Sequence, residues 1–147
     1  QVLWQAHTLG IPLDLPASHP FNPLGLLRLA LACARDGEQP NRYVCETVLR
    51  HVWRGGAEAS DADRLVALTA QLAPERASSD PAVKAQLQAN TDEAIALGLF
   101  GVPSIEVDGR VFWGLDALPM LRAYLNGDPW FDGPWHAVAS VAQGTRR

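Results

Sequence analysis

The chain has 147 residues, of which 48% are hydrophobic and 19% charged, and its formal net charge is −4. This length and apolar content suit one domain, with or without an added lobe, and predict a soluble globular protein. Basic residues form no cluster apart from Arg146 and Arg147, which argues against binding to nucleic acid or to an anionic membrane. The longest apolar run, 24–34, contains Arg28 and is shorter than the roughly 20 residues that a membrane-spanning helix needs.

The first 97 residues predict helices, because apolar residues recur there every three or four positions between glycine and proline breaks. The expected helices cover 1–9, 23–36, 41–53, 61–72 and 81–97. Residues 11–16 have an alternating sequence pattern and contain two prolines. They are therefore expected to be extended but not to form a central strand of a sheet. Asn22 and Ser60 are the expected N-caps of the second and fourth helices. The expected buried faces contain Leu24, Leu27, Ala30, Leu31 and Ala34 in the second helix and Leu65, Val66, Leu68 and Leu72 in the fourth.

After Gly98 the pattern changes to two short β-prone runs. Residues 104–107 and 110–113 flank Asp108-Gly109, the dipeptide that most strongly favours a type I′ hairpin. The sequence therefore predicts a two-stranded antiparallel hairpin.

A helix over 117–125 is expected next, in which Pro119 is tolerated because it lies in the first turn. Residues 128–147 contain several aromatic side chains among Pro and Gly. They predict a tail that is packed by its aromatic residues and has no regular secondary structure.

The cysteines and histidines do not have the spacing of a redox or metal site. Cys33 and Cys45 match neither a C-x-x-C pair nor a zinc-binding motif. Each lies in an apolar helical pattern, so two buried thiols with a structural role are expected. The histidines are scattered along the chain at His7, His19, His51 and His136. We predict no metal site.

The order helix, G-V-P, strand, D-G turn, strand, W-G-x-D and final helix is that of the C-terminal half of a thioredoxin-type domain. The segment TDEAIALGLFGVPSIEVDGRVFWGLDALPML, 91–121, closely resembles the 2-hydroxychromene-2-carboxylate isomerase family, whose relatives include kappa-class glutathione transferases and DsbA-type oxidoreductases. Upstream, LGIPLDLPASHPFNPL, 9–24, and the helices after it resemble the helical insertion of that family.

The resemblance implies an α/β, thioredoxin-like fold of the DsbA/kappa type with a large helical insertion. The present chain is then mostly helical and contains one β-hairpin. Residues 1–97 correspond to the helical insertion lobe, including the helix that leads back to the thioredoxin half. Residues 98–127 correspond to its C-terminal β-β-α unit, and 128–147 to the aromatic-anchored tail.

The resemblance also implies a glutathione site. Val102 and Pro103 match the G-V-P turn, whose proline is cis in such folds and whose preceding residue pairs its backbone with the cysteinyl part of glutathione. Leu115 and Asp116 match the positions that bind the γ-glutamyl end, with Leu115 contributing only its backbone. An aspartate just before a helix is equally well explained as an N-cap, and the two roles are compatible.

Three further residues are candidates for substrate binding, each with a structural alternative. Trp113 on the second strand is positioned to line a pocket for a planar substrate, although a tryptophan in a strand is more often part of the core. Asn22, with His19 and Phe21, lies in the loop that edges the substrate cleft in the family, and N-capping is its alternative role. Arg28 fits either an anion-binding position or an arginine whose stem covers apolar surface.

No catalytic residue is assigned within the chain. In the family, the serine or cysteine that stabilises or replaces the glutathione thiolate belongs to the first strand and helix of the thioredoxin fold, which would precede Gln1. A two-stranded hairpin alone is marginally stable and exposes an unpaired edge. We therefore expect either a preceding stretch of about 40 to 50 residues, the size of one βαβ unit, or strands supplied by another chain.

The resemblance implies a glutathione-dependent cis-trans isomerase acting on an unsaturated aromatic 2-keto acid or its cyclic hemiketal, as in aromatic catabolism. A DsbA-like thiol-disulfide oxidoreductase is the alternative and would need a reactive cysteine before Gln1. A truncated fragment or interaction module without activity is a further alternative. A homodimer with a small-molecule substrate is expected by analogy. The lack of a targeting signal and of a disulfide pattern predicts a cytoplasmic protein.

Overall fold

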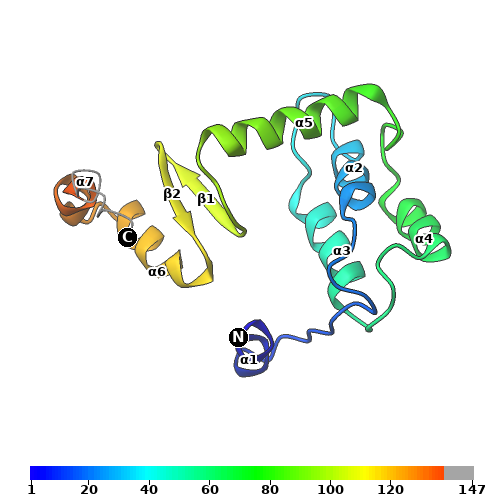
Figure 1. Ribbon diagram of the computed structural model, residues 1–147, viewed down its shortest axis with the longest axis horizontal. Coiled ribbons are helices and arrows are strands. Elements are labelled where there is room, and N and C mark those ends of the chain that lie inside the picture. The colour runs from blue at the N-terminus through cyan, green and yellow to red at the C-terminus, as the bar shows by residue number, and fades with distance from the viewer. Residues whose placement is uncertain (138–147) are drawn as a thin grey trace, which may run out of the picture. The chain divides into compact units, whose positions relative to one another are not determined.

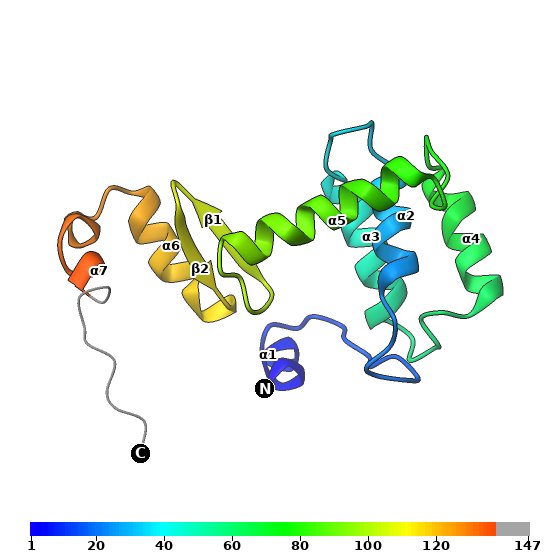
Figure 2. The ribbon, with the colours of Figure 1, turned by 45° about the horizontal axis from the view of Figure 1, so that its top comes forward.

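The structure, a computed structural model, describes residues 1–137 (Figures 1 and 2). The chain divides into two compact units, Gln1–Glu93 and Ala94–Arg147. The elements in chain order are α1 Val2–Thr8, α2 Leu24–Ala32, α3 Arg42–Trp53, α4 Ala62–Leu72, α5 Pro81–Ala96, β1 Ser104–Val107, β2 Arg110–Trp113, η1 Leu115–Ala117, α6 Leu118–Leu125, η2 Pro129–Asp132 and α7 Pro134–Ala137. Within this part of the chain, no helix combines the length and the apolar character needed to cross a membrane.

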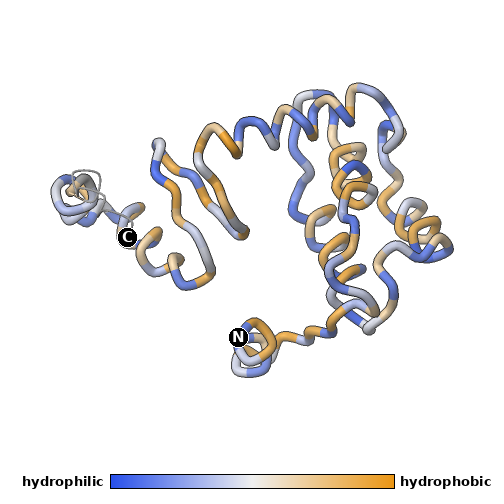
Figure 3. Tube along the Cα trace, in the orientation of Figure 1, coloured by the Kyte–Doolittle hydropathy of each residue, from blue (hydrophilic) through white to orange (hydrophobic). Residues whose placement is uncertain are grey.

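The core of the first unit lies among α2, α3 and α4. Most of α2 is hydrophobic (Figure 3), which suits a helix that is packed on more than one side. The main cluster contains Leu26, Leu29, Ala30, Val44, Val52, Ala59, Leu68 and Leu72. A smaller cluster joins α5 to α2 through Val83, which packs against Leu31 and Ala32. Removal of this apolar surface from water is the main stabilising contribution in the unit.

Polar side chains mark the starts of α3 and α4. The carboxamide of Asn41 accepts the N–H of Val44 over 3.0 Å, so Asn41 is the N-cap of α3 and the helix begins one residue later than expected. In α4 the cap is Asp61, which accepts the N–H three residues later over 2.9 Å. The prediction that Ser60 caps this helix is therefore wrong by one residue. The Ser60 hydroxyl donates instead to Glu58 over 3.1 Å.

Two predicted buried faces differ from the structure. In α2, which ends earlier than expected, Leu26 and Leu29 are buried, whereas Leu24 and Leu27 are exposed. On α4, Val66 is also exposed. Apolar side chains surround most of α2, so their spacing does not select the buried face. The contacts that α3, α4 and α5 make with α2 decide which face of α2 is buried.

The two cysteines differ in their surroundings. Cys33, at the end of α2, is partly buried and its thiol donates to the Leu29 carbonyl over 3.2 Å. This burial raises the pKa of the Cys33 thiol. Cys45 is exposed, so the prediction of two buried thiols is wrong for it. Because α3 directs Val44 and Val52 into the core, Cys45 falls on a different face of the same helix.

The second unit contains the predicted hairpin. The strands pair antiparallel from Ser104 opposite Trp113 to Val107 opposite Arg110. Between them, Asp108 and Gly109 have φ angles of 52° and 76°. Positive φ at both central positions is the requirement of a type I′ turn, which confirms the prediction from the Asp-Gly dipeptide.

Aromatic side chains form the core of the second unit. Phe112 of β2 is almost fully buried, and its ring lies 5.6 Å from Tyr124, 6.3 Å from Phe131 and 5.6 Å from Trp135, measured between centroids. This confirms that aromatic residues pack the tail as far as residue 137. The prediction of no regular structure there is wrong, because η2 and α7 occupy this region. Residues 138–147 of the predicted tail lie outside the described residues.

Candidate functional site

The turn between α5 and β1 exposes the backbone of Val102. The Val102–Pro103 peptide bond is cis, as the resemblance implied, and the Val102 side chain is 91% exposed. Neither the N–H nor the C=O of Val102 has a hydrogen-bond partner among residues 1–137. The turn is anchored nearby, because the Ser104 hydroxyl donates to the Gly101 carbonyl over 2.7 Å. The Val102 backbone can therefore pair with an extended peptide in the manner of a strand.

The end of β2 is attached to this turn. The N–H of Gly114 donates to the carbonyl of Pro103 over 2.9 Å, and Ser104 pairs with Trp113 in the hairpin. Gly114 has a φ of 93° and a ψ of 160°, a conformation that is nearly restricted to glycine. The chain therefore leaves β2 beside the Pro103 turn and enters η1 there.

Asp116 is an exposed carboxylate in η1 that does not cap a helix. No side-chain capping bond is present at the start of η1 or of α6, and Asp116 has no ion pair within residues 1–137. The interpretation of Asp116 as an N-cap is therefore wrong. Asp116 is not an N-cap because it lies within the helical turn η1 rather than before a helix. The carboxylate folds back over Gly114, where an added Cβ would collide with it.

The N–H groups of Leu115 and Asp116 are also available. Both belong to the first turn of η1, and neither has a hydrogen-bond partner in the described part of the chain. The side chain of Leu115 is exposed and apolar. Two backbone donors and one carboxylate thus lie side by side, a combination that complements a group carrying both a carboxylate and an ammonium.

An exposed aromatic pair borders the Val102 turn. The rings of Phe100 and Trp113 are 4.8 Å apart between centroids, and the residues are 78% and 50% exposed. The Trp113 indole lies against Gly101, where an added Cβ would be 2.6 Å from Nε1. Trp113 is therefore not a core residue, which was its structural alternative. Large exposed apolar side chains gathered at one place are typical of a binding surface.

Asn22 and Arg28 belong to the first unit. The Asn22 carboxamide accepts the N–H of Leu24 over 3.0 Å, but the residue that precedes α2 is Pro23, so the prediction of Asn22 as the N-cap is wrong by one residue. Near it, His19 lies 5.5 Å from Trp53 between ring centroids, and the His19–Pro20 bond is also cis, a feature that the sequence did not reveal.

The Nε of Arg28 is buried and has no partner within residues 1–137. No group of three or more His, Cys, Asp or Glu that could hold a metal ion is found in that part of the chain.

Gly101, Phe100 and Gly114 are site residues that sequence reasoning missed. Each glycine has a signal in the sequence, because it directly follows an aromatic residue, Phe100 or Trp113. Their role depends on the close approach of Trp113 and of Asp116, which only the tertiary structure reveals.

The chain is similar to known proteins in sequence and in fold. The sequence model of the DSBA-like thioredoxin domain family matches residues 3–126. The 2-hydroxychromene-2-carboxylate isomerase of Sphingobium xenophagum is 31% identical over 121 residues, which cover 78% of this chain and 60% of the relative. The chain thus spans about 60% of the length of that curated relative.

A solved structure of a 2-hydroxychromene-2-carboxylate isomerase is similar with a TM-score of 0.67 and 21% sequence identity. The match covers 97% of this chain and 68% of that one. The predicted fold class, thioredoxin-like of the DsbA type and mostly helical with one hairpin, is confirmed.

Proposed function

Since the chain belongs to the family of DsbA-like thioredoxin domains, we propose that it is the glutathione-positioning part of an isomerase of the 2-hydroxychromene-2-carboxylate isomerase type. The observation that carries the proposal is the unpaired, exposed backbone of Val102 next to the free carboxylate of Asp116. The likeness to the Sphingobium isomerase supports the reaction class. The substrate proposed is an unsaturated aromatic 2-keto acid or its cyclic hemiketal.

The cysteinyl residue of glutathione is proposed to pair with Val102. Its amide N–H would donate to the Val102 carbonyl, and its carbonyl would accept the Val102 N–H, as in a short antiparallel ladder. Two such bonds hold the cysteine backbone and so restrict where its sulfur can lie. This pairing needs only backbone groups of the protein, so it is insensitive to the side chain at position 102.

The γ-glutamyl end is proposed to bind at η1. Its α-ammonium would donate to the Asp116 carboxylate, while its α-carboxylate would accept the N–H groups of Leu115 and Asp116. The Gly114–Pro103 hydrogen bond of 2.9 Å holds these two subsites together. One tripeptide can therefore be fixed at two points, which reduces the freedom of its thiol.

When bound, glutathione would supply a thiolate that adds reversibly to an electron-poor carbon of the substrate and so permits rotation about the adjacent carbon–carbon bond. The residues of this chain orient the tripeptide and offer the aromatic surface of Phe100 and Trp113 to a planar substrate. The resemblance implies that the group that lowers the thiol pKa precedes Gln1, and this stays a prediction.

Calorimetric titration of glutathione into the full-length protein tests the binding site. Asp116→Asn keeps the shape of the side chain and removes the charge that pairs with the ammonium. A lost hydrogen bond to a charged group costs about 1.5 to 3 kcal/mol, so we expect at least about tenfold weaker binding. Asp63→Asn, at an exposed carboxylate of α4, is the matched control and leaves the affinity unchanged.

The backbone contact has its own test. Val102→Ala is expected to bind glutathione with wild-type affinity, whereas a glutathione analogue methylated on the cysteinyl amide nitrogen binds much more weakly. Equal binding of this analogue and of glutathione would contradict the proposed ladder. Glutathione-dependent conversion of 2-hydroxychromene-2-carboxylate, followed by absorbance, then tests the reaction itself.

A thiol-disulfide oxidoreductase is the second candidate, because the exposed Val102 backbone would receive a cysteine-containing peptide equally well. Reduction of insulin disulfides by the full-length protein discriminates between the two. Isomerisation without insulin reduction supports the first candidate, and insulin reduction without isomerisation supports the second.

A further inference from the structure

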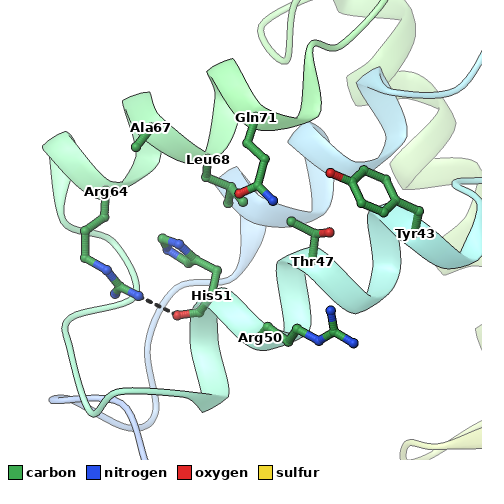
Figure 4. Close-up of a pocket in the computed structure, with 8 residues that line it drawn as sticks. All are labelled: Tyr43, Thr47, Arg50, His51, Arg64, Ala67, Leu68 and Gln71. Atoms are coloured by element: carbon green, nitrogen blue, oxygen red, sulfur yellow. Dashed lines mark hydrogen bonds between the residues drawn. The ribbon is translucent and has the colours of Figure 1, made fainter.

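A cavity of about 390 Å³ lies between α3 and α4, wholly within the first unit (Figure 4). Its size is within the range of sites for small molecules. Its lining residues are Tyr43, Thr47, Arg50, His51, Arg64, Ala67, Leu68 and Gln71. The following features indicate that it is built for a ligand.

Thr47 is a buried polar residue without a partner. Its relative exposure is 7%, and its hydroxyl has no hydrogen bond with any residue from 1 to 137. Two other threonines within helices, Thr69 and Thr91, donate to the carbonyl four residues earlier over 2.7 and 2.9 Å. The Thr47 hydroxyl makes no such bond to the carbonyl four residues earlier, and Thr47 lines the cavity instead. Among the described residues, the Thr47 hydroxyl is not one of the fully buried polar atoms that lack a partner, so it is accessible from the cavity and available to a bound acceptor.

Two further polar side chains line the cavity, and both belong to exposed residues. In Figure 4 the Gln71 amide, the Tyr43 hydroxyl and Thr47 gather in the middle of the cavity. Neither Gln71 nor Tyr43 has a side-chain hydrogen bond to another described residue. All three can donate a hydrogen bond, and each also carries an oxygen that can accept one, so the centre of the cavity offers unpaired polar groups to a ligand.

The charge around the cavity is positive. Arg50 and Arg64 line it, and no aspartate or glutamate does. Arg64 donates to the backbone carbonyl of His51 over 2.6 Å and has no ion pair within the described range. Arg50 contacts Glu46 over 3.1 Å, but that carboxylate also pairs with a second arginine. The cavity wall thus carries two arginines and no carboxylate, with Arg50 paired to Glu46 outside the wall, and these cations together with the hydrogen-bond donors attract an anionic oxygen group.

One side of the cavity is apolar. Ala67 and Leu68 of α4 face it, together with the ring of Tyr43. We propose that the cavity binds a small organic carboxylate, with its oxygens accepting hydrogen bonds from the Thr47 hydroxyl and the Arg50 guanidinium. Its carbon skeleton rests on Ala67 and Leu68. The proposal does not depend on glutathione binding in the second unit.

Benzoate, with benzamide as its uncharged counterpart, is the probe for this site. NMR titration of the full-length protein is expected to shift the signals of Thr47 and Gln71 with benzoate. Benzamide is expected to bind at least about tenfold more weakly, because it forms no ionic hydrogen bond. Binding of inorganic phosphate but not of benzoate, or of neither, would overturn the proposal.

Thr47→Val separates a ligand-binding role from a structural one. Replacement of an unpaired hydroxyl by a methyl group should leave the melting temperature of the free protein unchanged or raise it, while benzoate affinity falls about tenfold. Thr47→Ser keeps the hydroxyl and should bind benzoate within about twofold of wild type. Thr69→Val is the control on α4, where the hydroxyl is bonded within its own helix.

Arg50→Gln should weaken benzoate binding as well, because it removes one of the two cations at the cavity. Benzoate binding of wild-type strength in both Thr47→Val and Arg50→Gln would refute the assignment of the ligand to this cavity. A large fall in the melting temperature of free Thr47→Val would show that Thr47 serves the fold and would also count against the proposal.

Discussion

The backbone N–H of Gly114 donates to the carbonyl of Pro103 over 2.9 Å and thereby joins the end of β2 to the turn that precedes β1. The bond joins two segments that are separate in sequence, and each segment can contact a different part of a ligand. On one side Val102 offers its backbone, and on the other Asp116 offers its carboxylate.

Gly114→Ala should damage both stability and glutathione binding. At a φ of 93° and a ψ of 160°, any residue with a Cβ is strained, at a cost of about 1 to 3 kcal/mol. The added methyl would also collide with the Asp116 carboxylate and displace it. Urea unfolding measures the first effect and calorimetry the second. Gly25→Ala in α2 is the control, since a Cβ there meets no atom within 4 Å.

Phe112→Ala should destabilise the second unit strongly. The Phe112 ring is 1% exposed and contacts three other aromatic rings. Loss of a buried phenylalanine costs about 3 to 5 kcal/mol in transfer and cavity energy. Denaturant unfolding should show this loss, whereas Phe100→Ala, at an exposed ring, should change stability by less than about 0.5 kcal/mol. Similar effects of the two substitutions would argue against the aromatic core.

Ionisation of Tyr124 should lower the free energy of unfolding at alkaline pH. Its hydroxyl donates to Asp108 over 2.7 Å, and this hydrogen bond raises the pKa of Tyr124 above 10.0. A raised pKa in the folded state means that the contribution of this bond is fully present below the unfolded pKa. It is lost as the pH rises through the folded pKa.

Wild type should therefore lose stability above about pH 10 more steeply than Tyr124→Phe, as measured by urea unfolding across that range. The chain has two tyrosines, so absorbance titration of Tyr43→Phe reports Tyr124 alone. An ionisation midpoint at or below 10.0, the ordinary value, would contradict the prediction.

The side chain of Arg76 should stabilise the protein by binding the carbonyls at the end of α2. Its guanidinium donates to the carbonyls of Ala34 and Leu31 over 3.0 and 2.9 Å, to Asp36 over 3.0 Å and to Gln86 over 3.1 Å. These bonds satisfy carbonyls that a helix end leaves unpaired. Arg76→Ala is expected to cost about 2 to 4 kcal/mol in urea unfolding.

The matched control for this substitution is Arg42→Ala, which removes an arginine from an exposed ion pair with Glu46. Such pairs contribute about 0 to 1 kcal/mol, so the control should unfold close to wild type. Arg76→Lys keeps the charge but loses the planar fork, and it should fall between the other two variants.

The parts of the fold that were predicted correctly rest on local rules. The Asp108-Gly109 turn selects the hairpin through its positive φ angles. The predicted N-cap Ser60 was wrong because two neighbouring residues were both suitable caps. The bond between Ser60 and Glu58 decided between them.

The candidate site was predicted only in part for a related reason. The resemblance located Val102 and Asp116, and the alternative roles of Asp116 could be judged only once η1 had been seen. Thr47 had a weak signal, because it interrupts the apolar face of α3 between Val44 and Val48. Nothing in the sequence places Arg64 and Gln71 opposite it.

The sequence by itself determined the succession of helices, the hairpin and its register, because these follow from interactions between residues a few positions apart. Only the tertiary structure decided which leucines of α2 are buried, that Cys45 is exposed, and that Arg76 binds the Ala34 carbonyl 42 positions away. Each of these depends on contacts between distant segments, and a local pattern that is apolar on several sides is compatible with more than one such packing.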